Sequence, residues 1–111
     1  MFEQLFGSRI MEKILFYMTV NGKCFAAELR KSFDIPIFGI QRALARLERQ
    51  GILVSVVEGK SRFYYWNPRY PFLDDFKSFI EKAYSSLPDN IRKKYYERRV
   101  RKRPRKKGKA L

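Results

Sequence analysis

The chain has 111 residues, with 25 Lys and Arg against 11 Asp and Glu, and a formal net charge of +14. It contains no histidine and a single cysteine, Cys24, which excludes Ser-His-Asp and Cys-His catalysis, a zinc site and an intramolecular disulfide. A hydrophobic content of 45% with 16% aromatic residues predicts one folded domain, and we expect a binding protein that is not an enzyme and uses no metal and no cofactor.

The positive charge is concentrated near the C-terminal end. Residues 1–90 contain 13 basic and 10 acidic residues, a balance of +3, whereas residues 91–111 contain 12 basic residues and one acid, a balance of +11. Blocks of like charge are typical of tails that bind polyanions, so double-stranded DNA is the leading partner. We therefore expect a folded domain over 1–87 and a basic C-terminal helix and arm over 88–111. The absence of a long apolar run argues against a membrane partner and favours a cytoplasmic, nucleoid-associated protein, or a nuclear one in a eukaryote.

Apolar residues at helical and alternating spacings predict a mainly α-helical fold with a small β-hairpin. In chain order we expect a helix over 9–20, a very short strand at 24–25, helices over 26–33 and 37–50, strands over 52–57 and 62–66, a helix over 72–86, and a last helix that starts at Pro88 and fades into the arm. Ser8 is placed to cap the first helix, and Gly22 and Gly51 are placed to end two of them. The residue before Pro36 disfavours the helical region, which predicts a turn there.

The helices over 26–33 and 37–50, joined by a short turn and followed by a hairpin, indicate a winged helix-turn-helix. The residues expected to face the core are Ala27, Leu29 and Phe33 on the first helix and Ile40, Leu44 and Leu47 on the second. The residues expected to face outward on the second helix, the recognition helix, are Phe38, Gln41, Arg42, Ala45, Arg46 and Arg49.

These outward side chains are of the types that bind DNA in the major groove. Glutamine pairs with adenine and arginine with guanine, so Gln41 and Arg42, near the helix N-terminus, are suited to base readout. Arg46 and Arg49 lie further along and are suited to phosphates, which fix the register. Phe38, in an unusually apolar first turn, is suited to a thymine methyl group or to a protein partner.

Basic residues outside the recognition helix extend the predicted interface. Lys60 and Arg62, in the wing turn over 58–62, would reach the flanking backbone. In the arm, the residues expected to make nonspecific phosphate contacts are Arg98, Arg99, Arg101, Lys102, Arg103, Arg105, Lys106 and Lys107.

Four segments of the body share a pattern with a known family. They are Leu5-Phe6-Gly7-Ser8-Arg9, the recognition-helix run Ile40-Gln41-Arg42-Ala43-Leu44-Ala45-Arg46-Leu47-Glu48, the exit Gln50-Gly51-Ile52-Leu53 and the wing strand Arg62-Phe63-Tyr64-Tyr65-Trp66-Asn67-Pro68. Together they resemble the arsenic-repressor-type (ArsR-like) winged-helix regulators over about residues 5–87. The resemblance implies a DNA-binding transcriptional regulator that forms a homodimer through its first and last helices. Metal-sensing members use clustered Cys and His ligands, so this chain resembles a member that does not sense metal.

The apolar stripe of the helix over 72–86 predicts a dimer interface. Its candidate residues are Phe72, Phe76, Phe79, Ile80, Ala83 and Leu87. The same stripe leaves open a protein-interaction or adaptor module such as an antitoxin. The arm and the aromatic run over 63–66 leave open a nonspecific nucleoid or RNA-binding protein, although strand alternation favours placing half of those rings in the core. Cys24 is expected to be an inert core residue.

Overall fold

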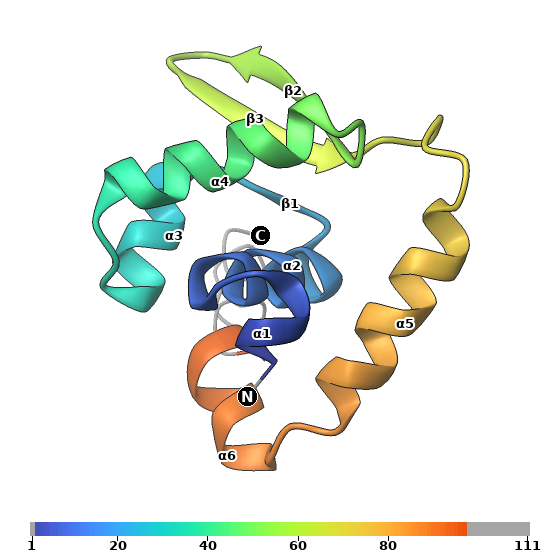
Figure 1. Ribbon diagram of the computed structural model, residues 1–111. Coiled ribbons are helices and arrows are strands. Elements are labelled where there is room, and N and C mark those ends of the chain that lie inside the picture. The colour runs from blue at the N-terminus through green and yellow to red at the C-terminus, as the bar shows by residue number, and fades with distance from the viewer. Residues whose placement is uncertain (1, 98–111) are drawn as a thin grey trace, which may run out of the picture.

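Helix α2 (Arg9–Asn21) lies at the centre of the computed structural model, which describes residues 2–97 (Figure 1). The other elements, in chain order, are α1 (Glu3–Phe6), β1 (Lys23–Cys24), α3 (Ala26–Phe33), α4 (Ile37–Arg49), β2 (Leu53–Glu58), β3 (Ser61–Trp66), α5 (Leu73–Ser85), α6 (Asp89–Ile91) and a π-helical segment, η1 (Arg92–Glu97). This order confirms the predicted mainly α-helical architecture with a hairpin wing.

Helix α2 begins and ends where its sequence predicts. The side-chain oxygen of Ser8 accepts a hydrogen bond from the backbone N–H of Met11 at 3.0 Å, and Gly22 ends the helix with a φ of 80°. Phe16 and Tyr17 are buried, and so are Met11, Ile14, Leu15 and Met18. The helix is therefore covered on several sides, which explains its central position.

A cluster of aromatic rings attaches three elements to α2. The Phe16 ring centre lies 5.9 Å from Phe2, 5.8 Å from Phe6, 5.7 Å from Tyr84 and 5.9 Å from Tyr96. These neighbours belong to the N-terminal segment with α1, to α5 and to η1, so one side chain packs against both ends of the described chain. The short helix α1 is an addition to the predicted elements.

The helix-turn-helix consists of α3 and α4. Asp34 ends α3 in the left-handed region with a φ of 55°, and α4 begins directly after Pro36, as predicted. Leu29 faces the core and Phe33 is half-buried. The prediction for Ala27 is wrong: this residue is exposed, and Ala26 packs against the core in its place.

The wing is a hairpin of β2 and β3, and β1 pairs with the other edge of β3 to give the antiparallel order β1-β3-β2. Its register places Val57 opposite Arg62 and Ser55 opposite Tyr64. Gly59 occupies the turn with a φ of 66°, a conformation that favours glycine.

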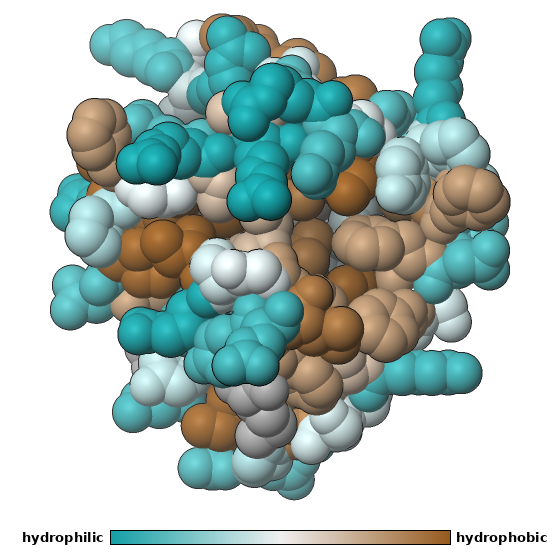
Figure 2. Space-filling view, in the orientation of Figure 1, coloured by the Kyte–Doolittle hydropathy of each residue, from teal (hydrophilic) through white to brown (hydrophobic). Residues whose placement is uncertain are grey.

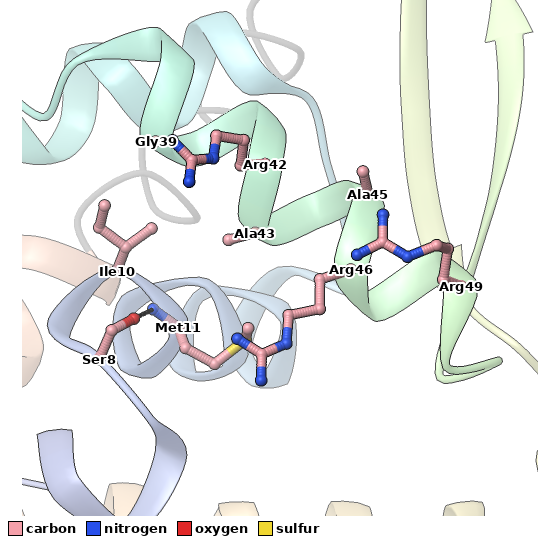
Figure 3. Close-up of a pocket in the computed structure, with 9 residues that line it drawn as sticks. All are labelled: Ser8, Ile10, Met11, Gly39, Arg42, Ala43, Ala45, Arg46 and Arg49. Carbon is pink, nitrogen blue, oxygen red and sulfur yellow. Dashed lines mark hydrogen bonds between the residues drawn. The ribbon is translucent and has the colours of Figure 1, made fainter.

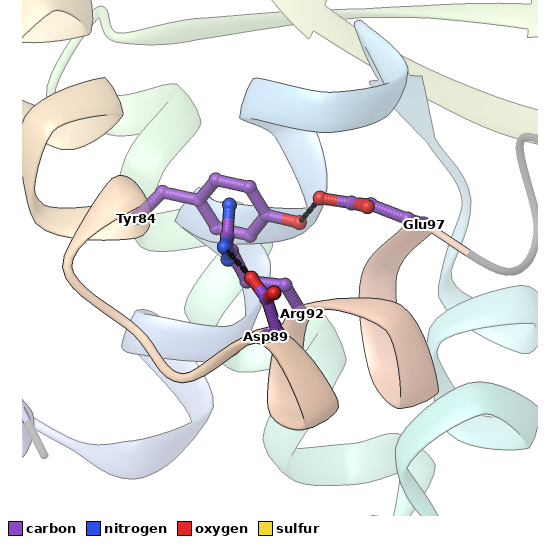
Figure 4. Close-up of polar contacts among 4 residues, drawn as sticks. All are labelled: Tyr84, Asp89, Arg92 and Glu97. Carbon is purple, nitrogen blue, oxygen red and sulfur yellow. Dashed lines mark hydrogen bonds and ion pairs between the residues drawn. The ribbon is translucent and has the colours of Figure 1, made fainter.

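After Pro88 the chain returns to α2 and packs against it (Figure 4). The Tyr84 hydroxyl donates to Glu97 Oε2 at 2.8 Å, and Arg92 forms an ion pair with Asp89 while its guanidinium lies 6.0 Å from the centre of the Tyr84 ring. The predicted last helix therefore begins at the expected place, but it is α-helical only over α6 and continues as the π-helical segment η1. Among residues 2–97, no helix has both the length and the apolar character required to span a bilayer.

Candidate nucleic-acid interface

Helix α4 buries one face and exposes the other, as its sequence predicts. Ile40, Leu44 and Leu47 are in the core. Of the residues expected to face outward, Phe38, Gln41, Arg42, Arg46 and Arg49 are exposed and Ala45 is half-buried. Hydrophilic side chains cover much of the region over α4 in Figure 2, whereas apolar side chains are visible at the upper edge, towards the hairpin.

Three arginines of α4 line one groove. It has a volume of about 690 Å³ and runs between α4 and the start of α2 (Figure 3). The lining residues are Ser8, Ile10, Met11, Gly39, Arg42, Ala43, Ala45, Arg46 and Arg49. Within residues 2–97, none of the three guanidinium groups has a hydrogen bond or an ion pair. Unpaired guanidinium groups in one groove create a strong attraction for an anion.

Gln41 lies on the opposite side of α4. It lines a second groove, of about 440 Å³, between the start of α3, α4 and the base of the wing. Arg62 and Tyr64 from β3 line the same groove. Gln41 and Arg42, which are neighbours in the sequence, therefore face different grooves, and the exposed face of α4 lies between them.

The wing is connected to α4 through a side-chain network. Arg62 Nη1 donates to Ser55 Oγ at 2.9 Å, and the same hydroxyl donates to Glu48 Oε2 at 2.8 Å. Arg62 therefore lies against the hairpin, close to the one acidic residue of α4, whereas Lys60 is exposed in the wing turn. Sequence reasoning missed Ser55 and Glu48 as site residues, because their proximity depends on how the hairpin packs against α4.

Solved structures with the same arrangement are known. HlyU from Vibrio cholerae has a TM-score of 0.60 at 17% sequence identity, over 75% of this chain and 87% of HlyU. BpsR from Bordetella bronchiseptica, whose DNA binding is regulated by 6-hydroxynicotinic acid, has a TM-score of 0.53 at 13% identity, over 77% of this chain and 70% of BpsR. The adhesin competence repressor AdcR from Streptococcus pyogenes has a TM-score of 0.53 at 12% identity, over 85% of this chain and 72% of AdcR.

This chain has a winged helix-turn-helix fold. The fold implied by the resemblance to ArsR-like regulators is thereby confirmed. No protein-family model matches the sequence, and no curated protein sequence is significantly similar to it.

The aromatic run of the winged-helix sheet is divided between the core and the surface. Tyr64 and Trp66 pack against the core. Phe63 contacts Phe25 with ring centres 4.9 Å apart and lies under the Lys23 ammonium, also at 4.9 Å. All four rings of the run are half-buried.

Cys24 is the second residue of β1, at one edge of the sheet, and its side chain is buried. Burial, with a smaller contribution from the nearby Glu28 carboxylate, raises the pKa of its thiol to about 12. A thiol with such a pKa carries almost no thiolate at neutral pH, in agreement with an inert core role.

The structure corrects the predicted dimer interface. Ile80, Ala83 and Leu87 are buried in the chain's own core, where α5 covers α2, so they are not available to a partner. Phe76 is half-buried and packs edge-on against Trp66 and Tyr70. The apolar side chains left exposed there are Phe72, Phe79 and Leu5, at 66%, 47% and 62% of their surface. Leu5 lies on α1, Phe79 lies on α5, and Phe72 is the N-cap residue of α5. Figure 2 shows apolar side chains beside α1 and over α5.

The predicted phosphate contacts of the arm lie outside the described residues. They are Arg98, Arg99, Arg101, Lys102, Arg103, Arg105, Lys106 and Lys107. In the described part of the chain, no group of three or more Cys, Asp or Glu side chains is positioned to hold a metal ion.

Proposed function

We propose that the protein is a non-enzymatic, sequence-specific regulator of transcription that binds double-stranded DNA and acts at the nucleoid. The observation that carries this proposal is the exposed face of α4, the second helix of the helix-turn-helix. It presents three arginines that have no hydrogen-bond or ion-pair partner within residues 2–97, together with Gln41, and its one acid, Glu48, is hydrogen-bonded to the wing. A helix in this position enters the major groove in winged helix-turn-helix proteins that bind DNA.

In the proposed complex, the first half of α4 faces the base edges. Gln41 and Arg42 approach the bases from the two sides of the helix. Arg46 and Arg49, further along the groove shared with α2, bind phosphates of one strand. Lys60 in the wing turn binds the flanking backbone, and the arm contributes contacts that do not depend on sequence.

We further propose that two copies bind together. The exposed side chains of Leu5, Phe72 and Phe79 form an apolar surface that water covers poorly. Beside it, residues of α1, α2, α4 and α5 line a mainly apolar hollow of about 200 Å³, with Arg46 and Gln50 among them. A second copy packed against this surface gives two α4 helices related by a two-fold axis, which reads a palindromic site.

Selection of bound sequences from a random duplex pool, at low and at moderate salt, tests the DNA-binding proposal. We expect an enriched palindrome whose half-site centres lie about one helical turn apart. The matched variant carries Arg42→Ala and Gln41→Ala, two exposed positions whose change leaves the core intact. This variant should still bind DNA, and its selected motif should lose the base pairs assigned to Gln41 and Arg42. Absence of a motif for the unmodified protein at both salt concentrations, or equal binding to random RNA, would contradict the proposal.

A further inference from the structure

Phe38 is an exposed apolar side chain on the recognition helix. It lies in the first turn of α4 and exposes 69% of its surface, the largest exposed fraction of any large hydrophobic residue described. Within residues 2–97 no other aromatic ring contacts it. It also lies on a different element from the apolar surface of α1 and α5, so the proposed dimer does not explain its exposure.

The position of Phe38 is determined by how α4 packs. A Cβ atom at Gly39, the next residue, would lie 2.8 Å from Ile10 Cδ1 of α2, so the helix contacts α2 closely at that point. Successive side chains are about 100° apart around a helix, which turns Phe38 away from this contact. Ala45, seven residues later, returns to nearly the same side as Phe38.

Phe38 therefore lies along the middle of the exposed face, with the half-buried Ala45 following on nearly the same side at the edge of the α2-side groove. Gln41 lines the groove on the wing side of Phe38, and Arg42 lines the groove on the α2 side. In helix-turn-helix proteins the residues near the N-terminus of the recognition helix contact the base edges, and Phe38 lies in the first turn of α4. Apolar side chains are thus placed where base edges would lie.

The major groove offers one apolar group to such side chains, the C5 methyl of thymine. The neighbouring Gln41 has the donor and acceptor pair that matches adenine. We infer that Phe38 and Ala45 contact thymine methyl groups and that Gln41 binds an adenine, so that the centre of each half-site consists of A·T pairs. This inference rests on the proposed function and specifies which bases the helix selects.

Replacing thymine by deoxyuridine in the selected duplex tests the inference, because it removes only the methyl group. Each thymine is replaced in turn, with symmetric replacement in both half-sites. At one or two positions we expect the affinity of the unmodified protein to fall about fourfold per half-site, the effect of one methyl group transferred from water. Phe38→Ala should bind the thymine and deoxyuridine duplexes equally at that position, and Phe38→Leu should still prefer thymine.

The matched control is Phe72→Ala, which removes a similarly exposed phenylalanine from the N-cap of α5. It should weaken binding to every duplex alike and leave the preference for thymine over deoxyuridine unchanged. The inference is overturned if no thymine position is sensitive to its methyl group, or if Phe38→Ala keeps the preference. If a motif is enriched but its affinity does not depend on any thymine methyl group, only this inference is refuted. If no motif is enriched, the proposed function is refuted as well.

Discussion

The arginines in the groove between α2 and α4 allow a quantitative prediction of how DNA affinity depends on salt concentration. These arginines have no partner within residues 2–97, so each is free to neutralise a phosphate. A protein that neutralises Z phosphates of B-DNA shows a log–log salt slope of about −0.9Z. The double variant Arg46→Ala with Arg49→Ala removes two phosphate contacts per copy, and therefore four from a dimer. The slope should become shallower by about 3.6.

Anisotropy titrations of a labelled duplex at several salt concentrations measure this slope. Between 50 and 200 mM salt, a change of 3.6 in slope corresponds to about 150-fold in the relative affinities of the variant and the unmodified protein. Arg42→Ala differs because we assign Arg42 to a base. It should reduce discrimination at one base pair by about 1–3 kcal/mol and leave the slope almost unchanged.

Lys82→Ala is the matched control for net charge. Lys82 is exposed on α5 and lies outside both grooves, so its removal changes the charge of the protein but no contact with DNA. The reasoning is refuted if this control flattens the slope as much per charge removed as the double variant does. It is refuted equally if the double variant lowers affinity by the same factor at every salt concentration.

Four further predictions concern the rest of the chain. Deleting residues 98–111 should flatten the salt slope and leave the selected motif unchanged, which the same titration and selection measure. Ser8→Ala removes the 3.0 Å cap of α2 and should lower the free energy of unfolding by about 1 kcal/mol in chemical denaturation, whereas Ser8→Asp should retain most of the stability. The thiol of Cys24 should react with a thiol reagent at neutral pH only after denaturation, because burial raises its pKa to about 12; rapid labelling of the folded protein would contradict this. Burial, together with the hydrogen bond to Glu97, raises the pKa of Tyr84 above its ordinary value of 10.0, so the unfolded chain loses this proton first. Stability should therefore be complete below pH 10 and fall as the pH rises further, and Tyr84→Phe should reduce that fall.

The parts of the fold that sequence predicts are those with local signals. Ser8 and Gly22 define α2, and the turn around Pro36 separates α3 from α4, because capping and proline geometry act within a few residues. Helix α1 has no such signal. It is a single turn, and it is held by the rings of Phe2 and Phe6 against Phe16, a contact that exists only in the folded chain.

The apolar stripe of α5 shows a second kind of limit. Periodicity identifies a buried face but does not identify what buries it. Ile80 and Ala83 are covered by the chain's own core, while Phe72 and Phe79 of the same predicted stripe are exposed. Separating these two groups requires the position of α5 relative to α2, which results from tertiary packing.

The sequence predicts which residues of α4 are exposed, but it does not predict which of the two grooves beside α4 each of them lines. Periodicity predicts that both Gln41 and Arg42 are exposed, and they are. Which groove each one faces depends on α2 on one side and on the wing on the other. The same dependence explains why the bridge from Arg62 through Ser55 to Glu48 was not predicted, since it joins three elements.

This bridge affects the electrostatics of the proposed interface. Glu48 is the one acid of α4, and its carboxylate accepts the hydrogen bond of Ser55 on the wing side, while the arginines line the groove on the α2 side. The positive charge of the arginines is therefore not neutralised by a neighbour on their own helix. A body with a balance of only +3 over residues 1–90 can thus present a locally strong positive field, because the field depends on where the charges are paired and not on their sum. Ser55→Ala breaks the bridge without changing any charge, so a loss of affinity in this variant would measure what the position of Glu48 and Arg62 contributes.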